Sequence, residues 1–245
     1  MRPGRRRIPK FFCTRAAISW RMHFLRSAKR PRGCLTKKTH IVYNSTVITV
    51  VDYGAGNIMS VVNSLRHIGV EAKLTDAPEQ VGRADRLIVP GVGNFGAAKR
   101  VLDQKGLTDA LRHAAGRGVP MLGICLGLQL FLSSSEESPG VGGLGLLDGQ
   151  VTQLATDGRK LPHIGWTSVS DTRGLLEGFD GRFFYFVHSF GAHSADCSAT
   201  AEYGETFAAA VESDNVCAVQ FHPEKSGAAG LRLLQRFCRR AGETV

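Results

Sequence analysis

Short apolar runs alternate with amphipathic helical stripes along the chain from about residue 47 onward. Val47–Val51, Leu87–Val89 and Pro120–Ile124 are continuous apolar runs, typical of parallel strands that are buried on both faces. Between the first two runs, apolar residues recur every three or four positions over Ile58–Ile68, and this stripe stops at Gly69. Strands that alternate with helices predict a parallel sheet with right-handed crossovers. We therefore predict an α/β fold with a doubly wound, mostly parallel sheet flanked by helices.

The same pattern continues to the C-terminus, with one interruption in the middle of the chain. Gly140–Gly181 is rich in glycine and turn residues and predicts hairpins and loops. The remaining predicted elements are helices over 96–104, 108–115, 126–132 and 227–240, and strands over 183–187 and 216–221.

Charge divides the chain into two parts. The net charge is +10, but residues 1–51 hold thirteen Lys and Arg and no acid, so the rest of the chain is near neutral at −3. We expect residues 1–45 to be a disordered basic extension and 46–245 to be a single domain. A start codon assigned too far upstream explains the extension best. Organelle targeting and an anchor for RNA or a membrane surface are alternatives, and a cytoplasmic location is favoured over an organelle.

Six scattered cysteines form no C-x-x-C pair, so neither a zinc ribbon nor a thioredoxin-like motif is indicated. Free thiols in a reducing compartment fit this spacing better than a disulfide framework does. No apolar stretch approaches the ~18 residues that a membrane-spanning helix needs.

The sequence Gly123-Ile124-Cys125-Leu126-Gly127 stands at a predicted strand-to-helix junction. Glycines on both sides of a cysteine permit a sharp turn that exposes the thiol at the amino end of the helix, where the nucleophilic thiolate is favoured. This is the cysteine form of a nucleophile elbow. From these five residues alone, a buried structural cysteine is an equally good interpretation.

His222 and Glu224 follow the predicted strand over 216–221, two residues apart. An extended backbone would direct both side chains to one side, so the acid would orient the imidazole as the base for Cys125. Cys125, His222 and Glu224 would then meet at the carboxyl ends of strands, where open α/β sheets bind ligands. A metal pair is an alternative, although no further ligands stand at zinc spacing. His163 and His188 are either ordinary loop residues or ligand contacts.

These motifs are similar to those of a known family. The chain resembles the class I, triad-type glutamine amidotransferases over about residues 47–240. Within that family it resembles most the glutaminase subunits of imidazole glycerol phosphate synthase. The elbow and His222-Pro223-Glu224 are shared by the whole family. The narrower resemblance is carried by the segments over 52–57, 90–95, 162–166 and 185–189.

The resemblance implies that Cys125 attacks the side-chain amide of glutamine while His222 acts as base and then acid. Gly91, Val92 and Leu126 would form the oxyanion hole. The other roles that it implies are glutamine binding by Gln129, Glu137 and Ser189, and contact with a (β/α)₈-barrel cyclase subunit by Asn57, Trp166 and Lys225. Neither a metal nor a cofactor is implied.

Two residues depart from the family pattern. Thr167 stands where asparagine is usual and Phe190 where tyrosine is usual, which puts local hydrogen bonds in question rather than the triad. Two other functions stay open. The first is that of a glutaminase of the same fold that serves another synthase, such as that of pyridoxal phosphate. The second is that of a non-catalytic regulatory module.

Overall fold

The computed structural model describes residues 47–239 apart from 55 and 156, so the predicted extension over 1–45 lies outside the described residues. The helices are α1 (Ile58–His67), α2 (Pro78–Gly82), α3 (Phe95–Gln104), α4 (Leu107–Gly116), α5 (Leu126–Phe131), α6 (Gly227–Cys238) and the 3₁₀ turns η1 (Gly174–Leu176) and η2 (Pro223–Lys225). The strands are β1 (Ile48–Val51), β2 (Ala72–Thr75), β3 (Leu87–Gly91), β4 (Met121–Cys125), β5 (Ser134–Ser135), β6 (Gln150–Gln153), β7 (His163–Ser168), β8 (Phe183–His188), β9 (Phe190–His193), β10 (Cys197–Tyr203), β11 (Glu205–Ser213) and β12 (Val216–Val219).

One large sheet organises the described residues, in the order β2-β1-β3-β4-β12-β11-β9-β6-β5, with β10 paired to β11. Its first five strands are parallel to one another, as the apolar runs predict. Beyond β12 the sheet turns antiparallel through β11, β9 and β6. The predicted doubly wound α/β fold is therefore confirmed, with an antiparallel extension on one side.

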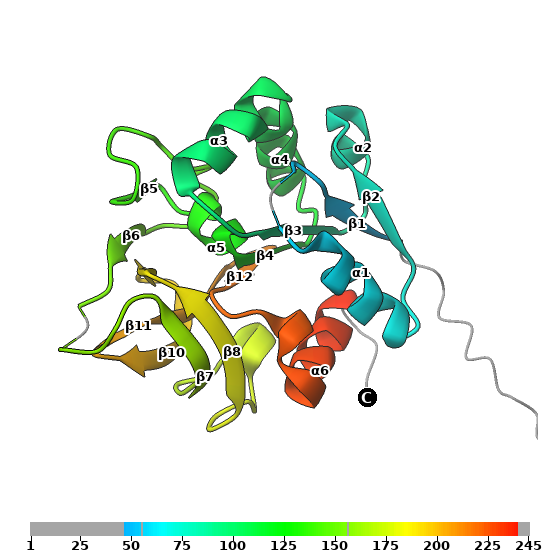
Figure 1. Cartoon of the computed structure of the whole chain (residues 1–245). Coiled ribbons are helices and arrows are strands. Elements are labelled where there is room, and N and C mark those ends of the chain that lie inside the picture. The colour runs from blue at the N-terminus through cyan, green and yellow to red at the C-terminus, as the bar shows by residue number, and fades with distance from the viewer. Residues whose placement is uncertain (1–46, 55, 156, 240–245) are drawn as a thin grey trace, which may run out of the picture. The chain divides into compact units, whose positions relative to one another are not determined.

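Both faces of the parallel strands are buried, which is why their sequences are apolar without interruption. In β3, Ile88 packs in the core cluster that contains α1 and α6, whereas its neighbours Leu87 and Val89 pack in the cluster that contains α3 and α4. Figure 1 shows α3 and α4 on one side of the sheet and α1 and α6 on the other. This alternation is the period of two that a strand imposes on its side chains.

The middle of the chain differs in part from the prediction. β7 lies in the segment for which hairpins are predicted, but it pairs with β8, which lies beyond that segment, in a separate two-stranded antiparallel sheet. β6, however, pairs with the distant β9 rather than with a sequence neighbour. The strands β9, β10 and β11 were not predicted, because their sequences mix a few β-branched and aromatic residues with alanine, glycine, serine and glutamate and so give no clear strand pattern.

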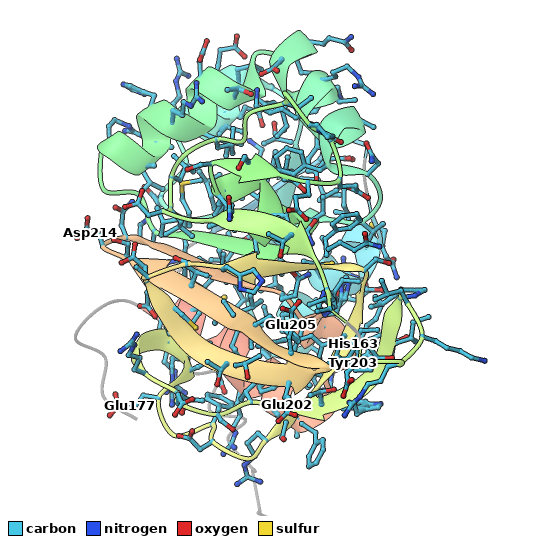
Figure 2. The ribbon with its side chains drawn as sticks, turned by 90° about the vertical axis from the view of Figure 1, so that its left-hand side faces the viewer. His163, Glu177, Glu202, Tyr203, Glu205 and Asp214 are labelled. Atoms are coloured by element: carbon cyan, nitrogen blue, oxygen red, sulfur yellow. The ribbon has the colours of Figure 1, made fainter. Side chains whose placement is uncertain are left out.

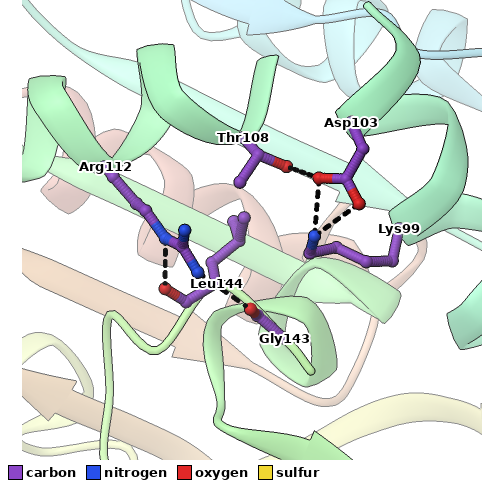
Figure 3. A network of polar contacts seen from close by, with 6 residues as sticks. All are labelled: Lys99, Asp103, Thr108, Arg112, Gly143 and Leu144. Atoms are coloured by element: carbon purple, nitrogen blue, oxygen red, sulfur yellow. Dashed lines mark hydrogen bonds and ion pairs between the residues drawn. The ribbon is translucent and has the colours of Figure 1, made fainter. Parts of the chain in front are cut away.

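A polar network fastens the loop after β5 to the helices (Figure 3). Lys99 of α3 donates to both carboxylate oxygens of Asp103 at 2.6 and 2.7 Å, and the hydroxyl of Thr108 donates to the same carboxylate at 2.6 Å. Arg112 of α4 donates to the carbonyl oxygens of Leu144 and Gly143. The helix pair is thereby tied to the loop that follows the predicted substrate-binding residue Glu137.

No helix in the described part of the chain has the length and apolar character needed to cross a membrane.

Candidate active site

The predicted catalytic residues converge at the carboxyl ends of three neighbouring parallel strands. Gly91 ends β3 and is in register with Cys125, the last residue of β4. On the other side of β4, Val219 of β12 is in register with Ile124, and His222 follows three residues later. The sheet order thus brings the loop at Gly91, the thiol and the imidazole to one edge, which is where such sheets bind ligands.

Cys125 has a strained backbone. Its φ of 55° and ψ of −106° lie where non-glycine residues are rare. The flanking glycines make this turn possible, since a Cβ on Gly127 would lie 1.9 Å from the carbonyl oxygen of Val89, and one on Gly123 would lie 2.9 Å from the backbone of Gly127. Cys125 is 6% exposed at the start of α5. A strained, glycine-flanked turn is the backbone geometry expected of a nucleophile elbow, and the role of Cys125 as the nucleophile stays a prediction.

His222 and Glu224 form the expected pair. Nδ1 of His222 donates to Oε1 of Glu224 at 2.7 Å, and both side chains are 3% exposed. The bond fixes the tautomer of the imidazole, so Nε2 is the atom available to the nucleophile. Nε2 is buried and has no hydrogen-bond partner of ordinary distance and angle among the described residues.

Charge stabilises the protonated form of His222. Burial by itself lowers the pKa of His222, but the neighbouring Cys125 thiol and Glu224 carboxylate outweigh that effect and raise the pKa to about 9. At neutral pH the imidazole therefore carries a proton. A positive charge at this position stabilises a thiolate and is ready to protonate a leaving group.

The backbone at this pair differs from the prediction. The segment is not extended, because Pro223–Lys225 form the 3₁₀ turn η2, and the turn rather than strand alternation brings the two side chains together. His222 is held by its own N–H, which donates to the carbonyl oxygen of Tyr185 at 2.9 Å. The Ser226 hydroxyl donates to the carbonyl oxygen of His222 at 2.6 Å and accepts from the N–H of Tyr185 at 3.0 Å. Strand β8 thus holds His222 in place.

A buried glutamine pair adjoins the thiol. Gln129 of α5 donates from Nε2 to Oε1 of Gln220 at 3.2 Å and to the carbonyl oxygen of Phe190 at 3.1 Å. Nε2 of Gln220 lies 3.7 Å from Sγ of Cys125. Sequence reasoning singled out Gln129 but missed Gln220. The available signal was its polarity in the apolar segment Val216–Phe221, because a buried polar residue needs a partner.

The predicted oxyanion loop also lies beside the elbow. Gly91 must be glycine, because a Cβ there would meet the Tyr53 hydroxyl at 2.0 Å and Cβ of Leu126 at 3.1 Å. Gly93 has a φ of +106°, which disfavours any side chain, while Val92 between them is 41% exposed. The backbone N–H groups of Val92 and Leu126 stay the predicted oxyanion donors.

The other two predicted glutamine-binding residues lie apart from the triad contacts. Oε2 of Glu137 accepts from the N–H of Phe95, at the start of α3, at 2.6 Å. Ser189 stands between β8 and β9, where its carbonyl oxygen accepts from the N–H of Leu154 at 3.1 Å. The structure shows no direct contact between either of them and Cys125, so their substrate roles stay predictions.

The predicted partner-facing residues include a surface pair. Trp166 is 54% exposed and makes an edge contact with Tyr185, while Nζ of Lys225 lies 5.7 Å from the centre of the same Tyr185 ring. Asn57, also predicted to face the partner, is exposed at the N-cap of α1, and its side chain makes no capping hydrogen bond.

His163 and His188 are buried rather than loop residues. Nε2 of His188 lies 3.1 Å from Nδ1 of His163, and Nδ1 of His188 donates to the carbonyl oxygen of Phe190 at 2.8 Å. Burial lowers the pKa of His163 to about 4 and that of His188 to about 3, so both rings are neutral at physiological pH. Neither ring contacts the thiol directly. Among the described residues, no group of three or more potential ligands is placed to hold a metal ion.

Comparisons with known proteins identify the family to which the chain is similar. Residues 49–241 match the family described as "Glutamine amidotransferase class-I". The chain is 47% identical over 196 residues to "Imidazole glycerol phosphate synthase subunit HisH" of Methanothermobacter thermautotrophicus, covering 78% of this chain and 97% of the relative. It is 44% identical over 220 residues to "Imidazole glycerol phosphate synthase hisHF, chloroplastic" of Arabidopsis thaliana, covering 86% of this chain and 37% of that longer relative.

Solved structures share the fold at low sequence identity. A crystal structure described as a glutamine amidotransferase superposes with a TM-score of 0.63 at 21% identity, over 78% of this chain and 98% of its own. The PurLQS structure from Thermotoga maritima gives a TM-score of 0.61 at 22% identity, over 79% of this chain and 97% of its own. At these identities the likeness concerns the fold alone.

Proposed function

This chain belongs to the class I glutamine amidotransferases and, within them, to the HisH subunits of imidazole glycerol phosphate synthase; from that membership we propose that Cys125, His222 and Glu224 hydrolyse glutamine to glutamate and ammonia. The observation that carries the proposal is the strained elbow at Cys125 beside the buried His222–Glu224 pair. We propose further that the ammonia passes to a (β/α)₈-barrel cyclase subunit, which uses it to form imidazole glycerol phosphate in histidine biosynthesis.

The first half of the reaction forms a thioester. The Cys125 thiolate attacks the side-chain carbonyl carbon of glutamine, and the negative charge moves to the carbonyl oxygen. The N–H groups of Leu126 and Val92 donate to that oxyanion. His222 gives its proton to the amide nitrogen, the carbon–nitrogen bond breaks, and ammonia leaves.

The second half regenerates the enzyme. Neutral His222 takes a proton from water, which attacks the thioester carbon and forms a second tetrahedral intermediate. Collapse of that intermediate breaks the carbon–sulfur bond and releases glutamate, and the thiolate again faces a protonated imidazole. Glu224 keeps its charge throughout and stabilises the imidazolium at each stage.

The hydrogen bonds of Gln129 limit how it binds the substrate. Both of its amide hydrogens are donated inside the protein, to Gln220 and to the carbonyl oxygen of Phe190. Its Oε1 therefore serves as an acceptor, which suits the α-ammonium group of glutamine. The Glu137 carboxylate and the backbone at Ser189 complete the proposed head-group contacts.

The partner surface that we propose is the outer face of the β7–β8 hairpin. Ile164, Trp166 and Phe183 are 60%, 54% and 58% exposed, and strand register places all three on one face of the hairpin. Large exposed apolar side chains that gather on one face mark an interaction site. Asn57 and Lys225 would add polar contacts to the cyclase. The four free cysteines of the described residues fit a reducing compartment such as the cytoplasm.

A choice of partner tests this function against its nearest rival. The full chain is mixed with the cyclase subunit of histidine biosynthesis or with the synthase subunit of pyridoxal phosphate synthesis, and glutamate production is measured. We expect that only the cyclase subunit binds the chain and stimulates its glutamate production. Stimulation by the pyridoxal phosphate synthase subunit instead would assign the chain to the rival, and no glutamate with either subunit would favour a non-catalytic module.

The Glu224→Gln variant tests the triad carboxylate. Loss of its charge is expected to lower kcat by about 10²-fold, since the imidazolium loses its electrostatic support. In the wild type, the raised pKa keeps His222 protonated to about pH 9, so activity declines only above that pH. Without the carboxylate this pKa falls, and the alkaline decline moves to lower pH. The measurement is kcat as a function of pH.

Glu202→Gln makes the same change on the exposed part of β10 and serves as the control. It should leave both the rate and the profile unchanged. If Glu224→Gln had the wild-type rate and the wild-type alkaline decline, the carboxylate would have no part in catalysis.

A further inference from the structure

A continuous series of hydrogen bonds connects the β7–β8 hairpin to the nucleophile. It begins at Thr167, whose Oγ1 lies 2.9 Å from Nε2 of His163. It passes from His163 to His188 at 3.1 Å and from His188 to the carbonyl oxygen of Phe190 at 2.8 Å. The series continues through Gln129 and Gln220 to Cys125, and none of these bonds belongs to the catalytic triad.

The direction of every bond on the histidine side is fixed by one atom. The carbonyl oxygen of Phe190 can only accept, so Nδ1 of His188 carries the hydrogen. Because His188 is neutral, its Nε2 is an acceptor and must receive the hydrogen on Nδ1 of His163. His163 is neutral as well, so its Nε2 accepts from the hydroxyl of Thr167.

The carbonyl oxygen of Phe190 also fixes the orientation of the side-chain amides of Gln129 and Gln220. Gln129 faces two acceptors, so its Nε2 must be the group that lies between them. Gln220 consequently presents Oε1 to Gln129 and Nε2 to the sulfur of Cys125. A reversed amide in either residue would place like groups against each other.

Aromatic packing holds the imidazole ring of His163 in place. His163 is stacked between Phe186, with ring centres 5.2 Å apart, and Tyr203, with ring centres 4.1 Å apart. Figure 2 shows His163 beside Tyr203 where β7 meets β10. With its plane fixed by two rings, His163 can satisfy Thr167 and His188 in only one orientation.

We propose that Thr167, His163, His188 and Gln220 are positioning residues for the glutaminase reaction, which hold the Gln129 amide and the Cys125 thiol in their reactive arrangement through the carbonyl oxygen of Phe190. The inference rests on the proposed function for its kinetic consequences. It also accounts for both departures from the family pattern. Thr167 supplies a hydrogen-bond donor as asparagine would, and at Phe190 the series uses the backbone rather than the side chain.

The first test compares Thr167→Val with Thr167→Asn in the full chain bound to its cyclase. Valine keeps the shape of threonine but removes the donor, whereas asparagine restores one. We expect valine to lower kcat and the alkylation rate of Cys125 by iodoacetamide roughly tenfold, the equivalent of one hydrogen bond of about 1.4 kcal/mol. Asparagine should stay within about twofold of the wild type.

Ser168→Ala is the matched control, because it removes a hydroxyl from the next residue of β7, and this hydroxyl makes no hydrogen bond to any of the residues that the structure describes. It should leave both rates unchanged. An unchanged alkylation rate in Thr167→Val, or equal losses in the valine and asparagine variants, would overturn the proposal. A purely structural role would lower thermal stability without changing the reactivity of the folded protein.

The second test is a double-mutant cycle with Gln220→Leu. Residues that act through one series are not independent, so Thr167→Val should add little to the loss that Gln220→Leu causes alone. Fully additive losses would contradict the proposal. If Gln220→Leu does not fold, the comparison of Thr167→Val with Thr167→Asn tests the proposal by itself. A wild-type chain that does not hydrolyse glutamine would defeat the proposed function, while the alkylation rates would still test the positioning residues.

Discussion

Replacing Cys125 by alanine is expected to lower glutamine hydrolysis by at least about 10⁴-fold while leaving the fold intact, because it removes the only atom that can form the thioester. The small side chain fits the same strained backbone, and no residue loses a strong hydrogen bond. Cys125→Ser should be nearly as inactive, since a serine hydroxyl, unlike a thiol, does not ionise beside the His222 imidazole. The measurement is glutamate release by the complex with its cyclase.

Cys197→Ala is the control for loss of a thiol. Cys197 is half-buried in β10, and burial raises the pKa of its thiol. Its replacement should leave the rate unchanged. Glutamate release by Cys125→Ala within tenfold of the wild type would refute the nucleophile assignment.

The second large effect concerns activation by the partner. We expect the chain alone to hydrolyse glutamine about 10²–10³ times more slowly than the complex, which is the cost of one missing oxyanion donor. Rotation of the peptide between Gly91 and Val92 would supply that donor, and a partner that binds the N–H-in form more tightly would shift the population toward it. Equal rates for the chain alone and for its complex with the cyclase and the cyclase's own substrate would contradict this.

Gly93→Val is the cleaner variant of this loop. A side chain at Gly91 would collide with the Tyr53 hydroxyl, so its effects would mix packing with backbone freedom. A side chain at Gly93 meets no atom within 4 Å, but the φ of +106° is unfavourable for it. We expect Gly93→Val to bind the cyclase normally and to lose most of the stimulation.

The matched control is Gly118→Val between α4 and β4. Its φ is +78°, and a Cβ there also meets no atom within 4 Å, so it carries comparable strain far from the loop. Stimulation should be normal in Gly118→Val. If both variants lost it equally, general strain rather than the oxyanion loop would be responsible.

The parts of the site that the sequence predicts are those that the backbone itself imposes. Gly123 and Gly127 are required by close contacts around a strained cysteine, so their spacing can be read without a structure. The apolar runs of β1, β3 and β4 are likewise imposed by burial on both faces. Because the carboxyl ends of parallel strands meet at one edge, the convergence of Cys125 and His222 follows from these two patterns.

The parts that the sequence does not predict depend on distant contacts. β10 and β11 become strands through the pairing of β10 with β11 and of β11 with β12, which their mixed composition does not indicate. His163 and His188 look like loop histidines until strand pairing places them opposite each other. The turn at Pro223 shows the same limit, since Glu224 reaches His222 by a 3₁₀ turn that spacing alone does not distinguish from a strand.

Covalent labelling by a chloroketone analogue of glutamine tests the central claim most directly. The thiolate would displace chloride and form a thioether, and peptide mass spectrometry would locate it among the six cysteines. Burial raises the pKa of the Cys217 thiol, and that of Cys238 to about 12, so both are poor nucleophiles at neutral pH. The predicted result is one adduct, at Cys125, formed more slowly when glutamine is present and absent from the Cys125→Ala variant. Labelling of another cysteine with Cys125 unmodified would contradict the assignment.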